Sequence, residues 1–172
     1  MDSIKNISTY YFWNVASYFD YHKCDEIIDN IWVGNIASAN DRSFDVIVNA
    51  STDIPFYQLK DNRKIIVEDN CRERDFLNME TQLEEIVDFI HEKVRRSKKI
   101  LVHCRVGAQR SCTIMAAYLI KYRDFKLKEA VEYIKARRAN AFNDYNHFEI
   151  VLQRFYIQMI NYRNNKVTLD VK

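Results

Sequence analysis

The sequence predicts a single α/β domain with a mostly parallel central sheet of about five strands, flanked by helices. Three observations favour this fold class. Short β-branched segments alternate along the chain with longer segments of helical periodicity. The length of 172 residues fits one domain of ordinary size. Hydrophobic residues make up 48% and charged residues 29%, which is a globular composition and not a disordered one.

The predicted strands are short, β-branched and bounded by polar turns. They cover residues 31–33, 44–49, 64–67 and 99–102. A parallel sheet binds its ligand beyond the carboxyl ends of its strands. The residues that follow these strands are therefore the first candidates for a functional site.

Helical periodicity predicts the layers around the sheet. Apolar residues at helical spacing mark residues 79–96, 127–134 and 148–162. Residues 110–121 are apolar on nearly every side, so this helix is expected to be central. A further helix is predicted over residues 8–20, where a Ser/Thr start precedes dense aromatic residues. Those aromatics either cover the core of the domain itself or form a homodimer surface.

Charge and targeting signals narrow the class of partner. The net charge of +2 argues against a dedicated nucleic-acid-binding protein. The apolar run Ile114–Ile120 is far shorter than the roughly 20 residues that cross a bilayer, so no membrane partner is expected. The first residues lack the pattern of a signal peptide. Without such a signal, the four cysteines indicate free thiols and a reducing compartment such as the cytoplasm.

The most informative segment surrounds Cys104. A buried strand leads into His103 and Cys104, and Arg110 and Ser111 open the apolar helix that follows. The residues between Cys104 and Arg110 can form a semicircle whose backbone N–H groups point inward and, with the helix N-terminus, bind a tetrahedral oxyanion. The same field lowers the pKa of a cysteine at its base. The planar fork of Arg110 can hold two oxygens of such an anion.

The glycine content supports this interpretation. The chain contains only two glycines, Gly34 and Gly107. A chain this poor in glycine is expected to keep Gly107 for a backbone need, here a tight turn around the anion. The predicted anion-binding loop is Arg105, Val106, Gly107, Ala108, Gln109 and Arg110.

The pattern His103-Cys104-x-x-Gly107-x-x-Arg110-Ser111 resembles the signature loop of the small dual-specificity protein phosphatases, which are cysteine-dependent. The resemblance covers roughly residues 26–160 and includes four further segments. These are IWVGN near the start, IIVEDN at 65–70, VDFI at 87–90 and, more weakly, NAFNDYNHF at 140–148, with Ala141 where proline is common. The length also resembles the stand-alone members found in large DNA viruses, which implies a location in the host cell or virion.

The resemblance implies a domain organisation. Residues 1–25 would form an N-terminal helical segment, residues 26–164 a dual-specificity phosphatase catalytic domain, and residues 165–172 a frayed tail. The implied fold is that of the cysteine phosphatases. No metal or other cofactor is expected, because the cysteines and histidines show no ligand spacing.

The resemblance also implies roles for individual residues. Cys104 would attack phosphorus and form a phosphocysteine intermediate, while Arg110 holds the equatorial oxygens. Ser111 would hydrogen-bond the departing thiolate or cap the helix. His103 would orient the loop and support Cys104. Asp69 resembles the general acid of the family, although it lies further before Cys104 than is usual there.

Two alternatives concern residues near this site. Asp75 is the rival of Asp69 as general acid, since it lies on the same connection. Cys71 and Cys112 are either inert or form a protective disulfide with an oxidised Cys104.

The expected substrates are phosphoproteins that carry phosphotyrosine and phosphoserine or phosphothreonine. No long insertion is present that would deepen the pocket around a phosphotyrosine ring. An RNA 5′-triphosphatase and a phosphoinositide phosphatase use the same kind of loop and stay as alternatives. A phosphopeptide-binding pseudophosphatase is the non-enzyme alternative, and it would need a defective nucleophile or acid.

Overall fold

The computed structural model describes residues 23–56, 61–143 and 146–170, with side chains up to residue 166. The helix predicted over residues 8–20, and with it the homodimer surface, lies outside the described residues.

Within the described residues, a five-stranded sheet of order β1-β2-β5-β3-β4 forms the centre of the molecule. The strands are β1 (Cys24–Ile28), β2 (Ile31–Gly34), β3 (Val46–Asn49), β4 (Asp61–Lys64) and β5 (Ile100–His103). β1 pairs antiparallel with β2, and the other three pairings are parallel. The predicted α/β class with a mostly parallel sheet is confirmed.

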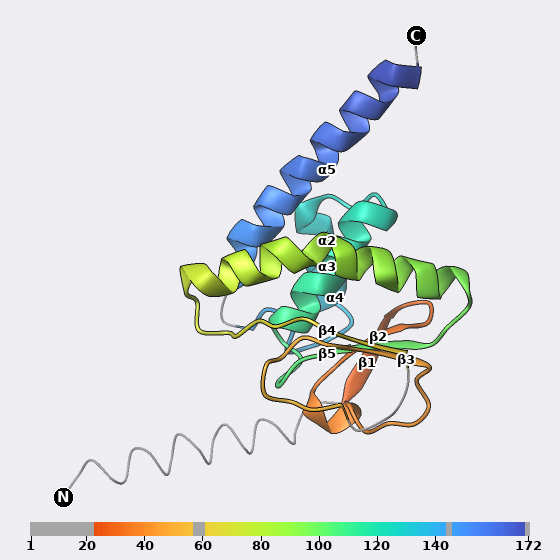
Figure 1. The fold of residues 1–172 in the computed structure, drawn as a ribbon, viewed down its shortest axis with the longest axis vertical. Helices are drawn as coiled ribbons and strands as arrows, with labels where there is room; N and C mark the ends of the chain where they lie inside the picture. Colours follow the sequence, from red (N-terminus) through yellow and green to blue (C-terminus); the bar gives the residue numbers. More distant parts are fainter. Residues whose placement is uncertain (1–22, 57–60, 144–145, 171–172) are drawn as a thin grey trace, which may run out of the picture.

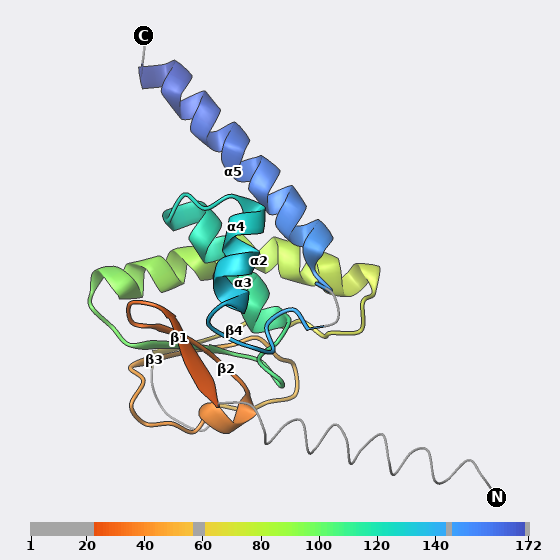
Figure 2. The same ribbon diagram turned by 180° about the vertical axis from the view of Figure 1, so that it is seen from behind.

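The four α-helices in the described part of the chain lie on one side of this sheet (Figures 1 and 2). They are α2 (Glu73–Arg95), α3 (Arg110–Tyr122), α4 (Leu127–Lys135) and α5 (Glu149–Asp170). α3 is central, as predicted, because every residue from Arg110 to Ile120 is buried. The other face carries the short 3-10 helix η1 (Ile36–Ser38) and loops. The far half of α5 extends away from the body of the molecule in both views.

The alternation of side chains along β5 divides the core between the two faces. Ile100 and Val102 belong to the large cluster under the helices. Leu101 points to the opposite face, where it packs with Phe44 and Ile47 in a much smaller cluster. Most of the apolar burial that stabilises the domain is therefore between the sheet and the helices. Among the described residues, no helix is long and apolar enough to cross a membrane.

The strand predicted at residues 64–67 was wrong in position. β4 is instead the polar stretch Asp61–Lys64, with exposed side chains at one edge of the sheet. Ile65 and Val67 are buried, which explains the strand-like pattern, but they pack under the helices beyond the end of the strand. The amide of Ile65 still donates to Asn49 O at 2.9 Å. The amide of Ile66 donates to the Gln82 side chain instead, so the pairing of β4 with β3 ends here.

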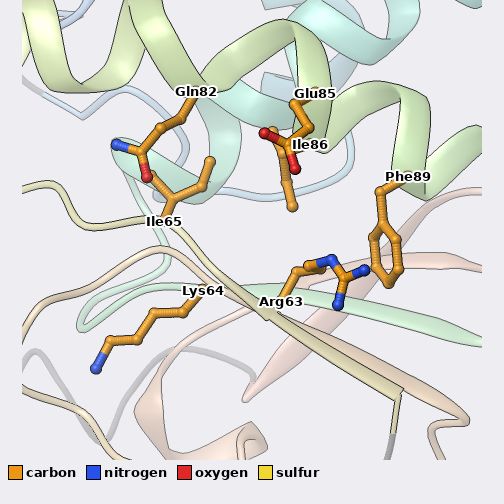
Figure 3. Close-up of a pocket in the computed structure, with 7 residues that line it drawn as sticks. All are labelled: Arg63, Lys64, Ile65, Gln82, Glu85, Ile86 and Phe89. Carbon is orange, nitrogen blue, oxygen red and sulfur yellow. The ribbon is translucent and has the colours of Figure 1, made fainter.

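A small pocket of about 60 Å³ lies where β4 meets α2 (Figure 3). The Arg63 guanidinium sits 4.7 Å from the centre of the Phe89 ring and closes one side of it. The space has room for a few water molecules at most, which excludes it as a substrate pocket.

Candidate active site

The candidate site lies where three parallel strands end side by side. Gly34, Asn49 and His103 are the last residues of β2, β3 and β5, and they pair in register. Cys104 follows directly, and its amide donates to Gly34 O at 3.3 Å. The segment after Cys104 then runs into the N-terminus of α3. This is the position at which parallel sheets bind ligands.

The two ends of the loop between Cys104 and Arg110 are fixed by backbone hydrogen bonds from distant segments. The amide of Ile36 donates to Arg105 O at 3.1 Å, and the amide of Phe142 donates to Ala108 O at 2.8 Å. Both bonds hold a loop carbonyl on the outside of the loop.

Arg138 fixes the middle of the loop. Its Nε donates to Gly107 O at 2.6 Å and its Nη2 donates to Val106 O at 3.5 Å. The Asn140 side chain also donates to Val106 O, at 3.3 Å. Arg138 is fully buried, and Nη1 pairs with the Asp25 carboxylate at 2.6 Å. The guanidinium thus bonds to Asp25 of β1 on one side and to the loop carbonyls on the other.

The outward carbonyls determine where the amides point. In a planar trans peptide, the N–H lies opposite to the carbonyl of the same peptide unit. The N–H groups of residues 106–109 therefore point to the inside of the loop. The amide of Gly107 indeed donates to Cys104 Sγ at 3.2 Å. Successive inward amides at a helix N-terminus form a site for an anion such as phosphate.

Gly107 has the backbone conformation that the sequence predicts for it. Its φ is +74°, in the left-handed region that favours glycine. A Cβ at this position would also lie 2.5 Å from Gly34 O and 2.4 Å from Arg138 Nη2. Any side chain here would push the loop away from both β2 and Arg138.

Cys104 is buried at the base of this loop. Burial alone would raise the pKa of its thiol, but the Arg110 charge and hydrogen bonds from Ser111 and Gly107 outweigh it, so the net pKa is lowered. The Ser111 hydroxyl lies 3.3 Å from Cys104 Sγ. The thiolate needed for nucleophilic attack is therefore favoured at this position.

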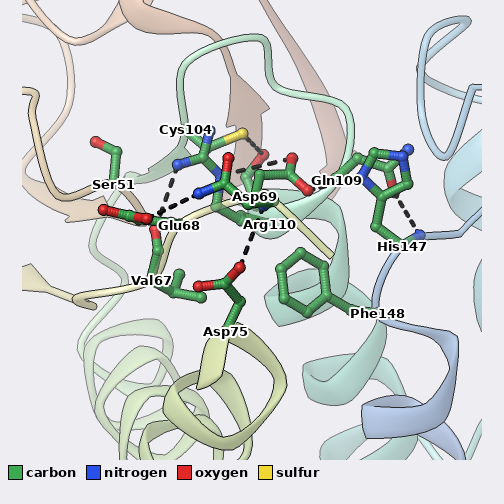
Figure 4. A network of polar contacts seen from close by, with 12 residues as sticks. Ser51, Val67, Glu68, Asp69, Asp75, Cys104, Gln109, Arg110, His147 and Phe148 are labelled. Atoms are coloured by element: carbon green, nitrogen blue, oxygen red, sulfur yellow. Dashed lines mark hydrogen bonds and ion pairs between the residues drawn. The ribbon is translucent and has the colours of Figure 1, made fainter. Parts of the chain in front are cut away.

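Arg110 and Asp69 face each other across the loop (Figure 4). Arg110 Nη1 donates to Val67 O at 3.3 Å, and Nε lies 3.7 Å from Asp69 Oδ2. The Arg110 side chain is 9% exposed and that of Asp69 is 20% exposed, so both can meet a ligand from solvent. The structure thus brings together the Cys104, Arg110, Ser111 and Asp69 side chains that the sequence singles out.

Asp75, the rival carboxylate, has a different environment. It is fully buried, and its Oδ2 accepts hydrogen bonds from the amides of Asn70 and Arg72, each at 3.3 Å. It is the N3 residue of α2 and satisfies N–H groups at the start of that helix. The carboxylate is therefore engaged by the backbone of the turn.

Segment 140–148 closes the other side of the site. Gln109 Nε2 donates to Asn143 O, and the amide of His147 donates to Gln109 Oε1, each at 3.1 Å. His147 Nδ1 then lies 2.7 Å from Asp69 Oδ1 (Figure 4). The sequence assigns no role to Arg138, Asn140 or His147, because they bind backbone or side chains 31 to 78 residues away.

His103, Cys112 and Cys71 lie in or near the site and differ in burial. Burial lowers the pKa of His103 to about 4, so this imidazole is neutral at pH 7. Burial raises the pKa of the Cys112 thiol, which donates to Gly107 O at 3.5 Å. Cys71 is exposed, and none of the four cysteines is part of a disulfide. The proposed protective disulfide stays a hypothesis.

A lowered-pKa cysteine under a ring of inward amides, with an arginine and a carboxylate opposite, defines the class of cysteine-based phosphate-transfer sites. Residues 32–158 match the family model "Dual specificity phosphatase, catalytic domain". The chain therefore belongs to the dual-specificity protein phosphatase family, and it is a protein phosphatase of this type. The predicted family is confirmed.

Individual relatives agree with this assignment. The chain is 26% identical over 120 residues to "Putative tyrosine phosphatase 123R" of Invertebrate iridescent virus 6, with 68% of this chain and 81% of that protein covered. It is 28% identical over 143 residues to dual specificity protein phosphatase 22-A of Danio rerio, covering 80% of this chain and 67% of that protein. The rat dual specificity protein phosphatase 5 is 47% identical over 62 residues, which are 36% of this chain and 16% of that protein.

Solved structures show the same fold. Human DUSP28 superposes with a TM-score of 0.71 at 21% identity, covering 80% of this chain and 95% of that one. The predicted cysteine-phosphatase fold is thus confirmed. The chain spans a small part of several longer relatives, such as the rat protein above.

Proposed function

We propose that this protein hydrolyses phosphotyrosine and phosphoserine or phosphothreonine in phosphoproteins through a phosphocysteine intermediate on Cys104. The observation that carries the proposal is the position of Cys104 Sγ at the base of the loop. There it accepts from the Gly107 amide and lies 3.3 Å from the Ser111 hydroxyl. Its pKa is lowered despite burial. The inward amides and the Arg110 fork supply the charge that a transferring phosphoryl group needs.

In the first step, the Cys104 thiolate attacks phosphorus and the ester P–O bond breaks. The Asp69 carboxyl group donates its proton to the departing oxygen, which leaves as the free hydroxyl of the substrate side chain. Arg110, 3.7 Å from Asp69, holds the equatorial phosphoryl oxygens at this stage. His103 is neutral and supports the backbone that carries Cys104.

In the second step, water attacks the phosphocysteine and gives up a proton to the Asp69 carboxylate. The P–S bond breaks, and Cys104 leaves as a thiolate that accepts a hydrogen bond from Ser111. The products are inorganic phosphate and an enzyme whose thiolate and protonated Asp69 are restored. No metal, oxidant or reductant enters the cycle.

One feature of the entrance supports proteins as the substrates. Arg105 and Asp53 form an ion pair at the rim with side chains about half exposed. This pair gives the entrance one group of each sign, in contrast with the several basic groups that a polyanionic headgroup or a triphosphate end would favour. The catalytic unit proposed here is residues 26–164 together with the first residues of β1, because Asp25 pairs with Arg138. Its proposed location is a reducing compartment, because Cys104 must remain a thiol.

The test is hydrolysis of p-nitrophenyl phosphate from pH 5 to 8 in the presence of a chelator. We expect turnover by the wild-type protein, inhibition by vanadate and no turnover by Cys104→Ser. Phosphopeptides with phosphotyrosine or phosphothreonine then measure the breadth of the specificity. No turnover of any of these by folded wild-type protein, with phosphopeptide binding intact, would support a pseudophosphatase instead.

A further inference from the structure

Three side chains of metal-binding chemistry lie together next to the loop. They are the Asp69 carboxylate, the Cys71 thiol and the His147 imidazole, and one ligand atom from each lies within 4.8 Å of the other two. Asp69 and Cys71 come from the connection that precedes α2, and His147 comes from the segment before α5. The spacing of cysteines and histidines in the sequence predicts no such group, because the chain returns to this point only in the fold.

The ligand set matches the preferences of zinc. Zn²⁺ binds cysteine sulfur, histidine nitrogen and carboxylate oxygen, and sites with three protein ligands leave a fourth position open. A thiolate with an imidazole favours such an ion over Mg²⁺ or Ca²⁺, which prefer oxygen ligands. An all-oxygen cluster would not give this selectivity.

The distances allow a small ion to fit with side-chain rotation alone. His147 Nδ1 and Asp69 Oδ1 are 2.7 Å apart, and the widest ligand separation is below 4.8 Å. Ligand atoms around tetrahedral zinc are roughly 3.3–3.8 Å apart, which lies between these two values. Cys71 is exposed and the Asp69 and His147 side chains are about one-fifth exposed, so an ion reaches the group from solvent.

The charges around the group balance a divalent cation. Asp69 and a deprotonated Cys71 together neutralise Zn²⁺. Arg110 Nε, 3.7 Å from Asp69 Oδ2, opposes the cation. Because the unbound group carries only the Asp69 charge, its net charge rises from −1 to zero on binding.

We propose that Asp69, Cys71 and His147 form an inhibitory site for Zn²⁺ that withdraws Asp69 from catalysis. On binding, the Cys71 thiol loses its proton to solvent, and the neutral His147 imidazole presents its Nδ1 lone pair to the ion while its remaining proton sits on Nε2. A carboxylate bound to zinc cannot donate a proton to the departing ester oxygen. The inhibitory effect rests on the proposed function, whereas the metal site itself does not.

Binding is measured first, in the Cys104→Ser background, because the reactive thiolate could bind zinc by itself. Zn²⁺ is titrated by calorimetry, and Co²⁺ is added as a probe whose thiolate charge-transfer absorption reports sulfur ligation. We expect one ion per chain and a cobalt–thiolate band. Cys71→Ser and His147→Asn should each weaken binding at least tenfold, and Cys24→Ser is the matched control that should not. Absence of binding in this background, or binding that Cys71→Ser leaves unchanged, would overturn the site.

Inhibition is measured next with a phosphothreonine peptide, because its departing alkyl oxygen needs the proton of Asp69. Zn²⁺ should inhibit the wild-type protein, a chelator should reverse the inhibition, and Mg²⁺ at the same concentration should have no effect. Cys71→Ser should need at least tenfold more Zn²⁺ for half-inhibition while its activity without metal is unchanged. Equal inhibition of both proteins would place the inhibitory ion elsewhere and overturn the regulatory role. If the wild-type protein shows no turnover, the proposed function fails, and the binding measurement still decides the site.

Discussion

At the scale of single residues, the environment of each carboxylate separates the two candidates for the general acid. Asp69 is partly exposed and lies between Arg110 and His147. Asp75 is buried and accepts from two backbone amides at the start of α2. A carboxyl group that must lose and regain a proton needs access to substrate and water. Of the two, Asp69 is the one exposed to solvent, so it is the general acid that we propose.

We expect Asp69→Asn to lower kcat about 100-fold or more for alkyl phosphates, because the departing oxygen then receives no proton. The loss should be smaller for p-nitrophenyl phosphate, whose leaving group needs little protonation. Asp75→Asn should keep the rate within a few-fold and lower the free energy of unfolding by about 1 kcal/mol. Steady-state kinetics on both substrates and urea unfolding measure these effects. A large rate loss in Asp75→Asn with normal rates in Asp69→Asn would reverse the assignment.

We expect Ser111 to stabilise the Cys104 thiolate twice, as the nucleophile before the reaction and as the leaving group when the phosphocysteine breaks down. Its hydroxyl, 3.3 Å from Sγ, is one of the groups that lower the pKa of Cys104. Ser111→Ala should raise that pKa, so the midpoint of iodoacetamide alkylation against pH moves upward. Loss of a hydrogen bond to a charged group costs about 1.5–3 kcal/mol, which predicts a roughly 10- to 100-fold slower breakdown of the phosphocysteine. Rapid-quench detection of accumulated phosphoenzyme would show it. An unchanged alkylation profile would reduce Ser111 to a helix-capping role.

At the scale of elements, the anion-binding loop depends on parts of the chain that do not touch the ligand. Its carbonyls are held outward by Ile36 after β2, by Phe142 and by Arg138 just after α4. An isolated loop with aligned amides would be unfavourable, because the amide dipoles repel one another. The buried Arg138 guanidinium counters this by binding two carbonyls while it pairs with Asp25.

Arg138→Lys tests this support without removing the charge that faces Asp25. A lysine ammonium lacks the planar fork and cannot bind both carbonyls in the same way. We expect at least tenfold weaker inhibition by vanadate and a loss of about 1–3 kcal/mol in the free energy of unfolding. Arg137→Lys is the matched control, since Arg137 is an exposed neighbour that stacks on Tyr133. Equal vanadate inhibition in the two variants would rule out a positioning role for Arg138.

At the scale of the whole molecule, sequence patterns predicted the features that depend on neighbouring residues in the chain and on which of them are apolar. The Cys104-to-Ser111 motif, the central helix α3 and the parallel sheet follow from contiguous residues. The edge strand β4 was misplaced, because a polar edge strand has no hydrophobic alternation to mark it. Arg138 and His147 could not be predicted, since their partners are 31 and 78 residues away and only the fold brings them together.

Acid stability is a property of the whole fold to which one buried histidine contributes. The His103 side chain ends the central strand β5, and burial lowers its pKa to about 4, against an ordinary value of 6.5. Between these two values the unfolded chain binds a proton that the folded chain does not. The free energy of unfolding therefore falls as the pH drops below 6.5, and the loss is complete only near pH 4.

From pH 7 to pH 5, this proton uptake should lower the free energy of unfolding by about 2 kcal/mol. His103→Gln removes the titrating group, so its stability should fall by about 2 kcal/mol less over the same interval, whatever its stability at pH 7. Urea unfolding at pH 7, 6 and 5 measures both slopes, and the carboxylates common to both proteins cancel in the difference. His103→Asn serves as the second variant if glutamine prevents folding. Parallel pH dependences for variant and wild type would mean that folding leaves the pKa of His103 unchanged, and that the central strand tolerates a charge where the structure buries a neutral imidazole.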